Sequence, residues 1–465
     1  MTGIALRARL AVTLTLVALL FVCFCFSDAQ LDLVAATCPD VGTIDQHSVR
    51  LIQSHLERML PASTFFSVFS VNLDKGCPFW QDDAQCVIRE CSVCHCDDSE
   101  IPPAWLREPH KEKACRDGEA CTKQDRLNDV DRSLTGLAAL VGQPVWHTAD
   151  SDAWTIRDEE DDKFFVDLRK NPEQYTGYSG PNARRIWEAV YDENCFTFSQ
   201  KCRSGICDVD TCKEERVLYT LISGLHASIS MHIAKRYLLG ERWGVNTSIY
   251  RERLRDHPER IANLKLAFAV VLRAVSKAST SLHPDSYPYV TGNKENDDNT
   301  QKEVKKLLSF PILQPGCEDK VFDESDMFLE KNEYLLPEFR SGFRNLSMIM
   351  DCVGCEKCRL WGKLQFLGLG TALRILFEEE TPNLERNELI ALFNVFHKLS
   401  SSVIWVEKME ALLKRDSRVK ARFGAVVAAI LLIFLALQLR SRKEQKKPEE
   451  KKPEDEDSGR KPHSQ

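Results

Sequence analysis

Three cysteines recur at three-residue intervals in the stretch DCVGCEKCRL (residues 351–360), as Cys352, Cys355 and Cys358. Thiols this close together can hold a metal ion, crosslink the chain or exchange disulfides. Two cysteines separated by two residues form a small, reducible disulfide ring, and their proximity can stabilise the attacking thiolate. The spacing alone leaves inert crosslinks and redox exchange both open.

The N-terminus decides in which compartment these thiols work. Residues 1–29 combine two early arginines, a long apolar run and small residues at 27 and 29, which predicts a secretory signal peptide. An uncleaved signal anchor is the alternative, and both place the following chain in the secretory lumen. Two sequons, at Asn246 and Asn345, are candidate glycosylation sites compatible with that compartment.

A second apolar run lies near the C-terminus. Residues 423–439 (FGAVVAAILLIFLALQL) carry no charge, and lysines and arginines follow them directly. The run is near the lower length limit for crossing a bilayer, and a buried core helix is the alternative. We predict a transmembrane helix over 423–439 and a disordered tail over 440–465. Because basic residues stay on the cytosolic side, the tail should be cytosolic and the domain over 30–415 lumenal.

The cysteine count fits an oxidising lumen. The chain has 18 cysteines, of which only Cys23 and Cys25 lie in the predicted signal, and the even number that remains favours disulfides. The lumenal part is long enough to form a core without crosslinks, yet its cysteines are clustered, which indicates that some of them do chemistry. The net charge of −7 and the lack of a basic stripe argue against a nucleic-acid-binding protein.

A metal site is one chemical alternative for the clustered thiols. The pairs Cys91–Cys94 and Cys352–Cys355 have the spacing of a four-thiolate zinc site, and residues 352–358 resemble part of an iron–sulfur ligand set. The fourth cysteine of the iron–sulfur set is absent, and the lumen favours disulfides over free thiolate ligands. We therefore predict no metal.

Long segments with few helix breakers predict a mainly α, single-domain fold, with helices over residues 214–239, 263–278, 364–378 and 386–414. An acidic, irregular stretch is expected from about 97 to 163. The first helix is apolar around most of its circumference, but Ser223, His226 and Ser230 form a polar stripe on one face. Because buried polar groups need partners, the stripe indicates either a satisfied core histidine or a bound ligand.

The second helix carries Arg273 within a run of apolar residues and contains no acid. A buried guanidinium needs an anion, and a phosphate would serve, so the two helices indicate an anionic cofactor inside a helix bundle. A flavin can accept the two electrons of a dithiol and pass them to oxygen. Since residues 368–373 (GLGTAL) lack the third glycine of a dinucleotide fingerprint, the flavin site would be helical and not of the Rossmann type.

Five stretches of the chain match the pattern of one family. They are CPFW (77–80), NPEQYTGYSGP (171–181), DENCF (192–196), LISGLHASI (221–229) and MDCVGCEKCRLWGKLQ (350–365). From about residue 38 to about residue 414 the chain resembles the endoplasmic reticulum oxidoreductins, the flavoprotein thiol oxidases that oxidise protein disulfide isomerase. The resemblance implies a single large helical domain with a flavin-binding helix bundle and long irregular, disulfide-rich loops, including a shuttle-cysteine loop at about 77–121.

The resemblance also implies roles for individual cysteines. Cys355 and Cys358 match the inner redox disulfide beside the flavin, and Cys86 and Cys91 match the outer shuttle disulfide. The other matches are structural or regulatory: Cys77 with Cys352, Cys195 with Cys212, Cys96 as a partner for Cys91, and Cys121 as a partner for Cys86.

The flavin-contacting positions of the family carry over to Thr176, Trp187, Ser223, His226, Arg260 and Arg273. The match has three departures. Gln174 stands where the family has an arginine, and the C-terminal anchor is unusual for the family. Cys94 and Cys115 are additional cysteines, so the regulatory pairing stays open.

The implied function is an electron relay. Reduced protein disulfide isomerase reduces the shuttle disulfide, the shuttle reduces the inner disulfide, and FAD takes the electrons and passes them to oxygen, giving hydrogen peroxide. The expected location is the endoplasmic reticulum membrane, with the catalytic domain in the lumen. The alternatives are a non-enzymatic, membrane-anchored, disulfide-rich ectodomain and a lumenal metal-binding protein.

Overall fold

The computed structural model describes residues 46–77, 91–106, 153–155, 158, 163–173, 186–187, 190, 213–239, 242–314, 324–327, 335–378 and 382–444. The predicted signal peptide, the tail after residue 444 and several of the predicted site residues lie outside these ranges. The fold and the candidate site below are those of the described residues.

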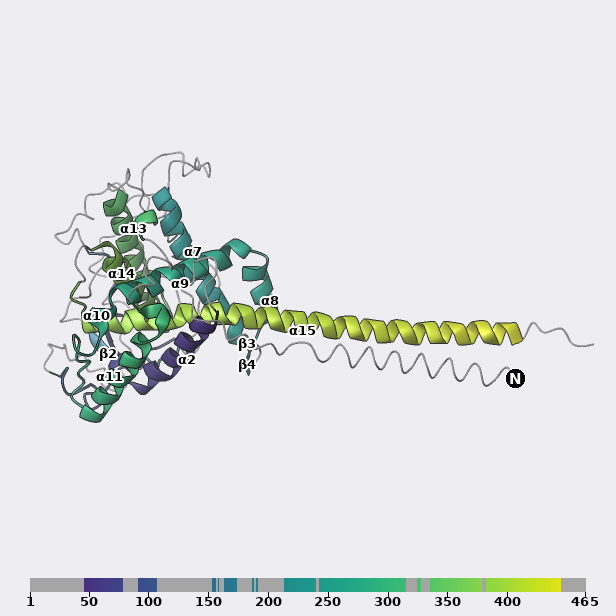
Figure 1. Cartoon of the computed structure of the whole chain (residues 1–465), viewed down its shortest axis with the longest axis horizontal. Coiled ribbons are helices and arrows are strands. Elements are labelled where there is room, and N and C mark those ends of the chain that lie inside the picture. The colour runs from purple at the N-terminus through teal and green to yellow at the C-terminus, as the bar shows by residue number, and fades with distance from the viewer. Residues whose placement is uncertain are drawn as a thin grey trace, which may run out of the picture.

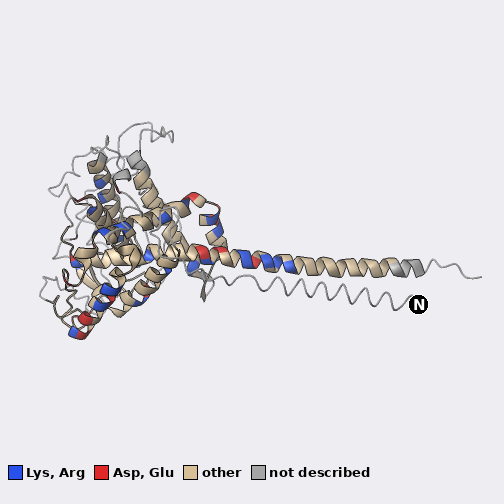
Figure 2. Cartoon of the chain, viewed as in Figure 1, with Lys and Arg blue, Asp and Glu red and all other residues tan. Residues whose placement is uncertain are grey.

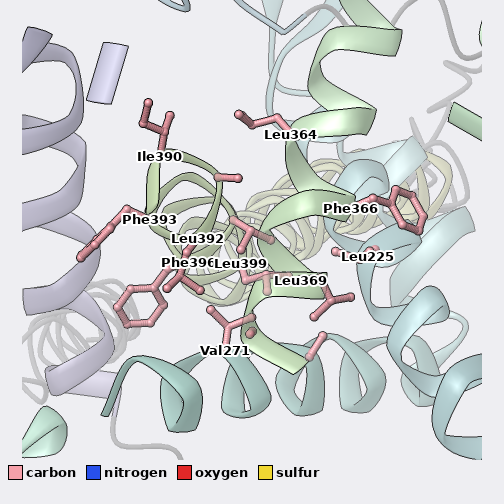
Figure 3. Close-up of a cluster of buried hydrophobic side chains, with 14 of the residues drawn as sticks. Leu225, Val271, Leu364, Phe366, Leu369, Ile390, Leu392, Phe393, Phe396 and Leu399 are labelled. Atoms are coloured by element: carbon pink, nitrogen blue, oxygen red, sulfur yellow. The ribbon is translucent and has the colours of Figure 1, made fainter. Parts of the chain in front are cut away.

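Five helices form the body of the molecule (Figure 1). They are α2 (Gln46–Ala62), α7 (Lys213–Lys235), α9 (Pro258–Lys277), α14 (Glu356–Phe377) and α15 (Arg386–Glu444). Helix α15 packs against α14, α9, α7 and α2, and α7 packs along α9. Their buried faces meet in one core (Figure 3), which includes Leu225 of α7, Val271 of α9, Leu369 of α14 and Phe396 of α15.

Shorter elements surround this bundle. The helical ones are α3 (Thr64–Ser67), α8 (Thr247–Tyr250), η5 (Arg251–Arg255), α10 (Ser279–Leu282), α11 (Lys294–Leu308), η6 (Pro311–Leu313), η7 (Glu324–Met327), α13 (Leu335–Ile349) and η8 (Met350–Cys352). The strands form two antiparallel pairs: β1 (Val68–Val71) with β2 (Phe164–Asp167), and β3 (Tyr237–Leu239) with β4 (Arg242–Gly244). The predicted mainly α fold is confirmed.

Two glycines allow the helices of the bundle to cross closely. A Cβ atom added at Gly224 of α7 would lie 2.5 Å from the carbonyl oxygen of Asn263 in α9. A Cβ atom at Gly368 of α14 would overlap with the carbonyl oxygen of Ala391 in α15. Any side chain at either position would therefore force two core helices apart.

The predicted helix ends differ from the observed ones. Helix α9 begins at Pro258, since proline at the first helical turn lacks an N–H that would have no partner there. Helix α14 begins at Glu356, inside the cysteine motif, and not at residue 364. The predicted extension of α7 to residue 239 was wrong, because Tyr237–Leu239 pair with β4 as a strand.

Helix α15 runs well past the predicted end at residue 414 and projects from the body (Figure 1). Of the described helices, α7 and α15 contain segments apolar and long enough to cross a membrane by composition alone. The α7 segment is 72% buried inside the protein, whereas none of the apolar window of α15 is buried. Figure 2 shows lysines and arginines on α15 between the body and the apolar stretch; these are Lys414, Arg415, Arg418, Lys420 and Arg422.

Candidate active site

Cys355 and Cys358 lie at the N-terminus of α14. Cys355 is the N-cap residue, with an extended backbone, and its sulfur accepts a hydrogen bond from the N–H of Cys358 at 3.4 Å. Both side chains are buried, and neither is in a disulfide, so this pair is in its dithiol form. A sulfur at this position faces the free N–H groups and the positive end of the helix dipole, which favour a thiolate.

The two thiols are electrostatically unequal. A hydrogen bond from the Cys358 thiol, together with the N–H groups of Lys357 and Cys358, lowers the pKa of Cys355 in spite of its burial. The pKa of Cys358 is raised, because its proton is held by Cys355 and because its side chain is buried. Cys355 is therefore the sulfur better suited to carry negative charge, as attacking or leaving thiolate.

Cys91 lies directly against this pair. Its Sγ is 2.8 Å from the Sγ of Cys355, although 264 residues separate the two in sequence. Cys91 is disulfide-bonded, and its partner is none of the other described cysteines. The structure thus brings a disulfide sulfur and a thiol sulfur into contact, which is the arrangement that disulfide exchange requires.

The loop before Cys355 is fixed by covalent and polar contacts. Cys77 and Cys352 form a disulfide, the pairing that the family resemblance implies. Arg359 donates from Nε to the carbonyl oxygen of Val353 at 2.8 Å and from Nη1 to that of Leu73 at 2.6 Å. These contacts join the segment before Cys77 to the loop before Cys355, so the reactive sulfur is held on a rigid support.

A buried ion cluster supports the same loop. The Nζ of Lys363 in α14 lies 2.9 Å from a carboxylate oxygen of Asp351 and 2.8 Å from one of Asp158, and it donates to the carbonyl oxygen of Asn72 at 2.8 Å. Burial raises the pKa of Asp351, which Lys363 opposes. Removing the lysine would leave two carboxylates without their cation.

The cysteines that follow Cys91 are not bonded. Cys94 is exposed and Cys96 is half-buried, and both are free thiols. Burial raises the pKa of Cys96 to about 12, so its thiolate population is small in this conformation. The predicted partners Cys86 and Cys121, and the predicted pair Cys195 and Cys212, lie outside the described residues.

Four of the predicted flavin positions come together beside α7. The rings of Trp187 and His226 stack with centroids 3.8 Å apart and an angle of 11° between their planes. Burial first, and then the nearby charges of Arg260 and Arg253, lower the pKa of His226 to about 4. Arg260 donates from Nη1 to the carbonyl oxygen of Arg253 at 2.9 Å.

The fourth residue of this group is Ser223, one helical turn from His226. Its hydroxyl oxygen accepts a hydrogen bond from the side-chain amide of Asn263 in α9 at 2.9 Å. Apolar side chains complete the surroundings, since Ile229 and Ile233 pack with Trp187. Flat aromatic surface, hydrogen-bonding groups and guanidinium charge fit a ligand with a flat ring and an anionic part, as in a dinucleotide.

Arg273 is separate from that group. It lies 13 residues beyond Arg260 on α9, about 20 Å along the helix axis at the usual rise per residue. Its guanidinium binds both carboxylate oxygens of Glu324, at 2.8 and 3.2 Å. The sequence pattern missed this carboxylate because it comes from η7, 51 residues away. Thr176 lies outside the described residues.

The sequons occupy different environments. Asn246 is the N-cap of α8, and its side-chain oxygen accepts from the N–H groups of Ser248 and Ile249. Asn345 is a half-buried residue within α13. Glycosylation at either position stays a prediction.

Three residues around the segment of Cys91 and the first turns of α14 were missed by sequence reasoning. Glu356 and Asn171 contact the segment that carries Cys91. In the sequence, only a charged residue inside CEKC and an amide residue at the start of NPEQ could have indicated these contacts. Lys398 of α15 pairs with Glu173 and lies over the ring of Trp361, 5.2 Å from its centroid. Burial lowers the pKa of Lys398.

Comparison with known proteins agrees with this arrangement. Residues 51–406 match the family model described as Endoplasmic Reticulum Oxidoreductin 1. The chain is 41% identical over 394 residues to endoplasmic reticulum oxidoreductin-1 of Arabidopsis thaliana, covering 81% of this chain and 80% of that protein. It is 38% identical over 455 residues to human ERO1-like protein alpha, covering 84% and 92% respectively.

Solved structures show the same likeness. A cysteine-to-alanine double mutant of S. cerevisiae Ero1p superimposes with a TM-score of 0.52 at 28% identity, covering 80% of this chain and 97% of that one. A structure of Ero1p described as the source of disulfide bonds for oxidative protein folding gives the same score at 29% identity, covering 80% and 98%. The chain belongs to the endoplasmic reticulum oxidoreductin family, whose members are oxidoreductases that form disulfides in oxidative protein folding.

Proposed function

We propose that this protein is an FAD-dependent thiol oxidase that reoxidises protein disulfide isomerase in the lumen of the endoplasmic reticulum. The observation that carries the proposal is the 2.8 Å contact between the sulfurs of Cys91, which is in a disulfide, and Cys355, which is a thiol. Cysteines with only structural roles would not need to touch each other. In a disulfide relay, by contrast, the sulfurs of the outer and inner pairs must come into contact.

The first step is on the outer disulfide. A thiolate of reduced protein disulfide isomerase attacks the Cys86–Cys91 disulfide, and its second thiol resolves the mixed disulfide. The isomerase is thereby oxidised, and Cys86 and Cys91 become thiols. A mobile carrier is needed because a folded substrate protein cannot enter the bundle in which Cys355 and Cys358 are buried.

The second step moves the electrons inward. The Cys91 thiolate attacks the sulfur of Cys355 in the Cys355–Cys358 disulfide, so that a Cys91–Cys355 bond forms and Cys358 leaves. Cys86 then attacks Cys91, which restores the outer disulfide and releases Cys355. The lowered pKa of Cys355 makes it a good leaving group in this last exchange. Cys91 in a disulfide beside an inner pair in the dithiol form corresponds to the end of this step.

Bound FAD supplies a two-electron acceptor for the inner dithiol and a donor to oxygen, giving hydrogen peroxide. Thr176, Trp187, Ser223, His226, Arg260 and Arg273 would hold it. The stacked rings of Trp187 and His226 suit an aromatic system, and Arg260 suits a phosphate. Arg273 would have to exchange Glu324 for a phosphate. Burial of Cys355 and Cys358 keeps water and foreign thiols from the inner pair.

The apolar part of α15, residues 423–439, is proposed to anchor the protein in the endoplasmic reticulum membrane. Five basic residues precede this stretch and five follow it closely: Lys414, Arg415, Arg418, Lys420 and Arg422 before, and Arg440, Arg442, Lys443, Lys446 and Lys447 after. The count of positive charges is therefore balanced, and the lumenal orientation rests on the N-terminal signal. The catalytic domain is lumenal and the tail cytosolic in this arrangement.

The proposal is tested on the full chain purified in detergent from a flavin-replete host. We expect a yellow protein whose colour bleaches with excess dithiol and returns in air. It should consume oxygen when reduced protein disulfide isomerase is added. Cys358→Ala should abolish this turnover, and Cys94→Ala, which removes an exposed free thiol, is the matched control. A colourless protein would refute the flavin, and normal turnover by Cys358→Ala would refute the assigned site.

A further inference from the structure

The segment that carries Cys91 is hydrogen-bonded to the start of α14. The carbonyl oxygen of Cys91 accepts from the N–H of Lys357 at 3.0 Å. The N–H of Val93 donates to a carboxylate oxygen of Glu356, also at 3.0 Å. Both bonds join the chain just after the Cys91 sulfur to the first residues after Cys355, so they hold the two segments together next to the contact between the sulfurs.

Asn171 holds the other end of the same segment. The N–H of Cys94 donates to its side-chain oxygen at 2.7 Å, and its side-chain amide donates back to the carbonyl oxygen of Cys94 at 2.8 Å. Asn171 is fully buried, and its own carbonyl oxygen accepts from the indole N–H of Trp361 in α14 at 2.8 Å. Residues 91–94, here called the docking segment, are thus tied to α14 at both ends.

The position of Glu356 does not favour thiolate chemistry. Its negative charge raises the pKa of Cys355, opposing the hydrogen bonds that lower it. An acid between two redox cysteines therefore weakens the thiolate that the exchange uses. An acid in the first turn of a helix is stabilising, which is the purely structural explanation of Glu356. That explanation accounts for the charge but not for the bond to Val93.

We propose that Glu356 and Asn171 are positioning residues that dock the segment 91–94 on α14 and so hold the Cys91 sulfur against Cys355 during internal electron transfer. This inference rests on the proposed function, because the two residues would align the sulfurs for the second step of the proposed relay. Hydrogen bonds, and no covalent bond to α14, hold residues 91–94 at these contacts, so docking can be reversed, as a segment that must also meet an external partner requires.

The test uses the full chain carrying Cys358→Ala. In this background the Cys355 thiolate attacks Cys91, a Cys91–Cys355 disulfide forms and the former partner of Cys91 leaves as a thiolate. Without Cys358 only the former partner of Cys91 can cleave the new bond, so the exchange approaches an equilibrium, and its initial rate is followed after a jump from acidic to neutral pH. The fraction of the new bond is measured by mass spectrometry of peptides after acid quenching and alkylation, which needs no flavin and no turnover.

Three variants separate docking from helix stability. Glu356→Ala removes the acceptor for Val93 and should lower the initial rate of Cys91–Cys355 bond formation about five- to ten-fold, as expected for loss of one ordinary hydrogen bond. Glu356→Gln keeps a side-chain oxygen and should stay within about two-fold of the parent. Glu295→Ala removes an exposed first-turn acid from α11 and is the matched control, which should change nothing.

The outcomes are distinct. If the parent forms no Cys91–Cys355 bond, the relay itself fails and the inference falls with it. If the bond forms equally fast in Glu356→Ala, the docking role is wrong while the relay stands. If Glu356→Gln lowered the rate of Cys91–Cys355 bond formation as much as Glu356→Ala, the inference would also be overturned. The rate would then depend on the charge of Glu356 and not on the hydrogen bond that it accepts. Thermal unfolding of each variant checks that the rates compare folded proteins.

Discussion

Replacing Gly224 by alanine probes the closest crossing in the bundle. The added Cβ would lie 2.5 Å from the carbonyl oxygen of Asn263 and 2.8 Å from the Cβ of Ala267. Restoring an ordinary contact of 3.4 Å to the carbonyl oxygen requires α7 and α9 to separate there by about 0.9 Å. Overpacking of this kind costs ~1–3 kcal/mol, and the better helix propensity of alanine offsets ~1 kcal/mol of it.

We therefore expect Gly224→Ala to lower the free energy of unfolding by up to about 2 kcal/mol. For a domain of this size that corresponds to a fall in the melting temperature of up to about 3 °C. The same shift would weaken the hydrogen bond from Asn263 to Ser223, which lies in the proposed flavin site, so flavin retention should fall as well. Both effects have one cause, the displacement of α9 from α7.

The assay is thermal unfolding followed by circular dichroism, together with the flavin absorbance that survives gel filtration. Gly424→Ala is the matched control, because a Cβ added there meets nothing within 4 Å. That variant should unfold like the parent. A melting temperature for Gly224→Ala equal to or above that of the control would refute the close crossing of α7 and α9 at Gly224.

Two further predictions concern titratable groups. In the reduced protein, iodoacetamide should alkylate Cys355 at lower pH than Cys358, because the pKa of Cys355 is lowered and that of Cys358 is raised; mass spectrometry across a pH series checks the order. Lys363→Met should destabilise the protein by about 3–5 kcal/mol near pH 7, since it leaves Asp351 and Asp158 buried without their cation. The folded-state pKa of Asp351 is already raised by burial and should rise further, so its protonation restores stability as pH falls; denaturant unfolding should show a smaller loss at pH 4 than at pH 7.

Local patterns predicted much of the fold. The polar stripe on α7 was visible because Ser223 and His226 interrupt an apolar face at helical spacing, and both residues lie in the candidate site. The start of α14 was placed too late, because cysteine is not a common N-cap residue and the motif was interpreted through its thiols alone. The end of α7 was placed too late because an apolar run such as Tyr237–Leu239 suits a strand as well as a helix.

Contacts between distant parts of the chain could not be predicted in the same way. The carboxylate that pairs with Arg273 belongs to an element far along the chain, and nothing near Arg273 in sequence indicates it. The bond from Val93 to Glu356 joins residues 263 apart. Periodicity and motif spacing describe one segment at a time, whereas these contacts depend on how α14 packs against the rest of the bundle.

The continuity of α15 has a mechanical consequence. One uninterrupted helix contributes Phe393 and Phe396 to the core and then extends through the apolar stretch. Leu413 is the last buried residue in the described part of the chain, and the helix rises ~15 Å from there to Phe423. With residues 423–439 in a bilayer, as proposed, a rigid helix and not a flexible linker would connect the catalytic body to the membrane. The height and tilt of the body would be fixed, so soluble partners would meet the same face at the same distance above the lipid at every encounter.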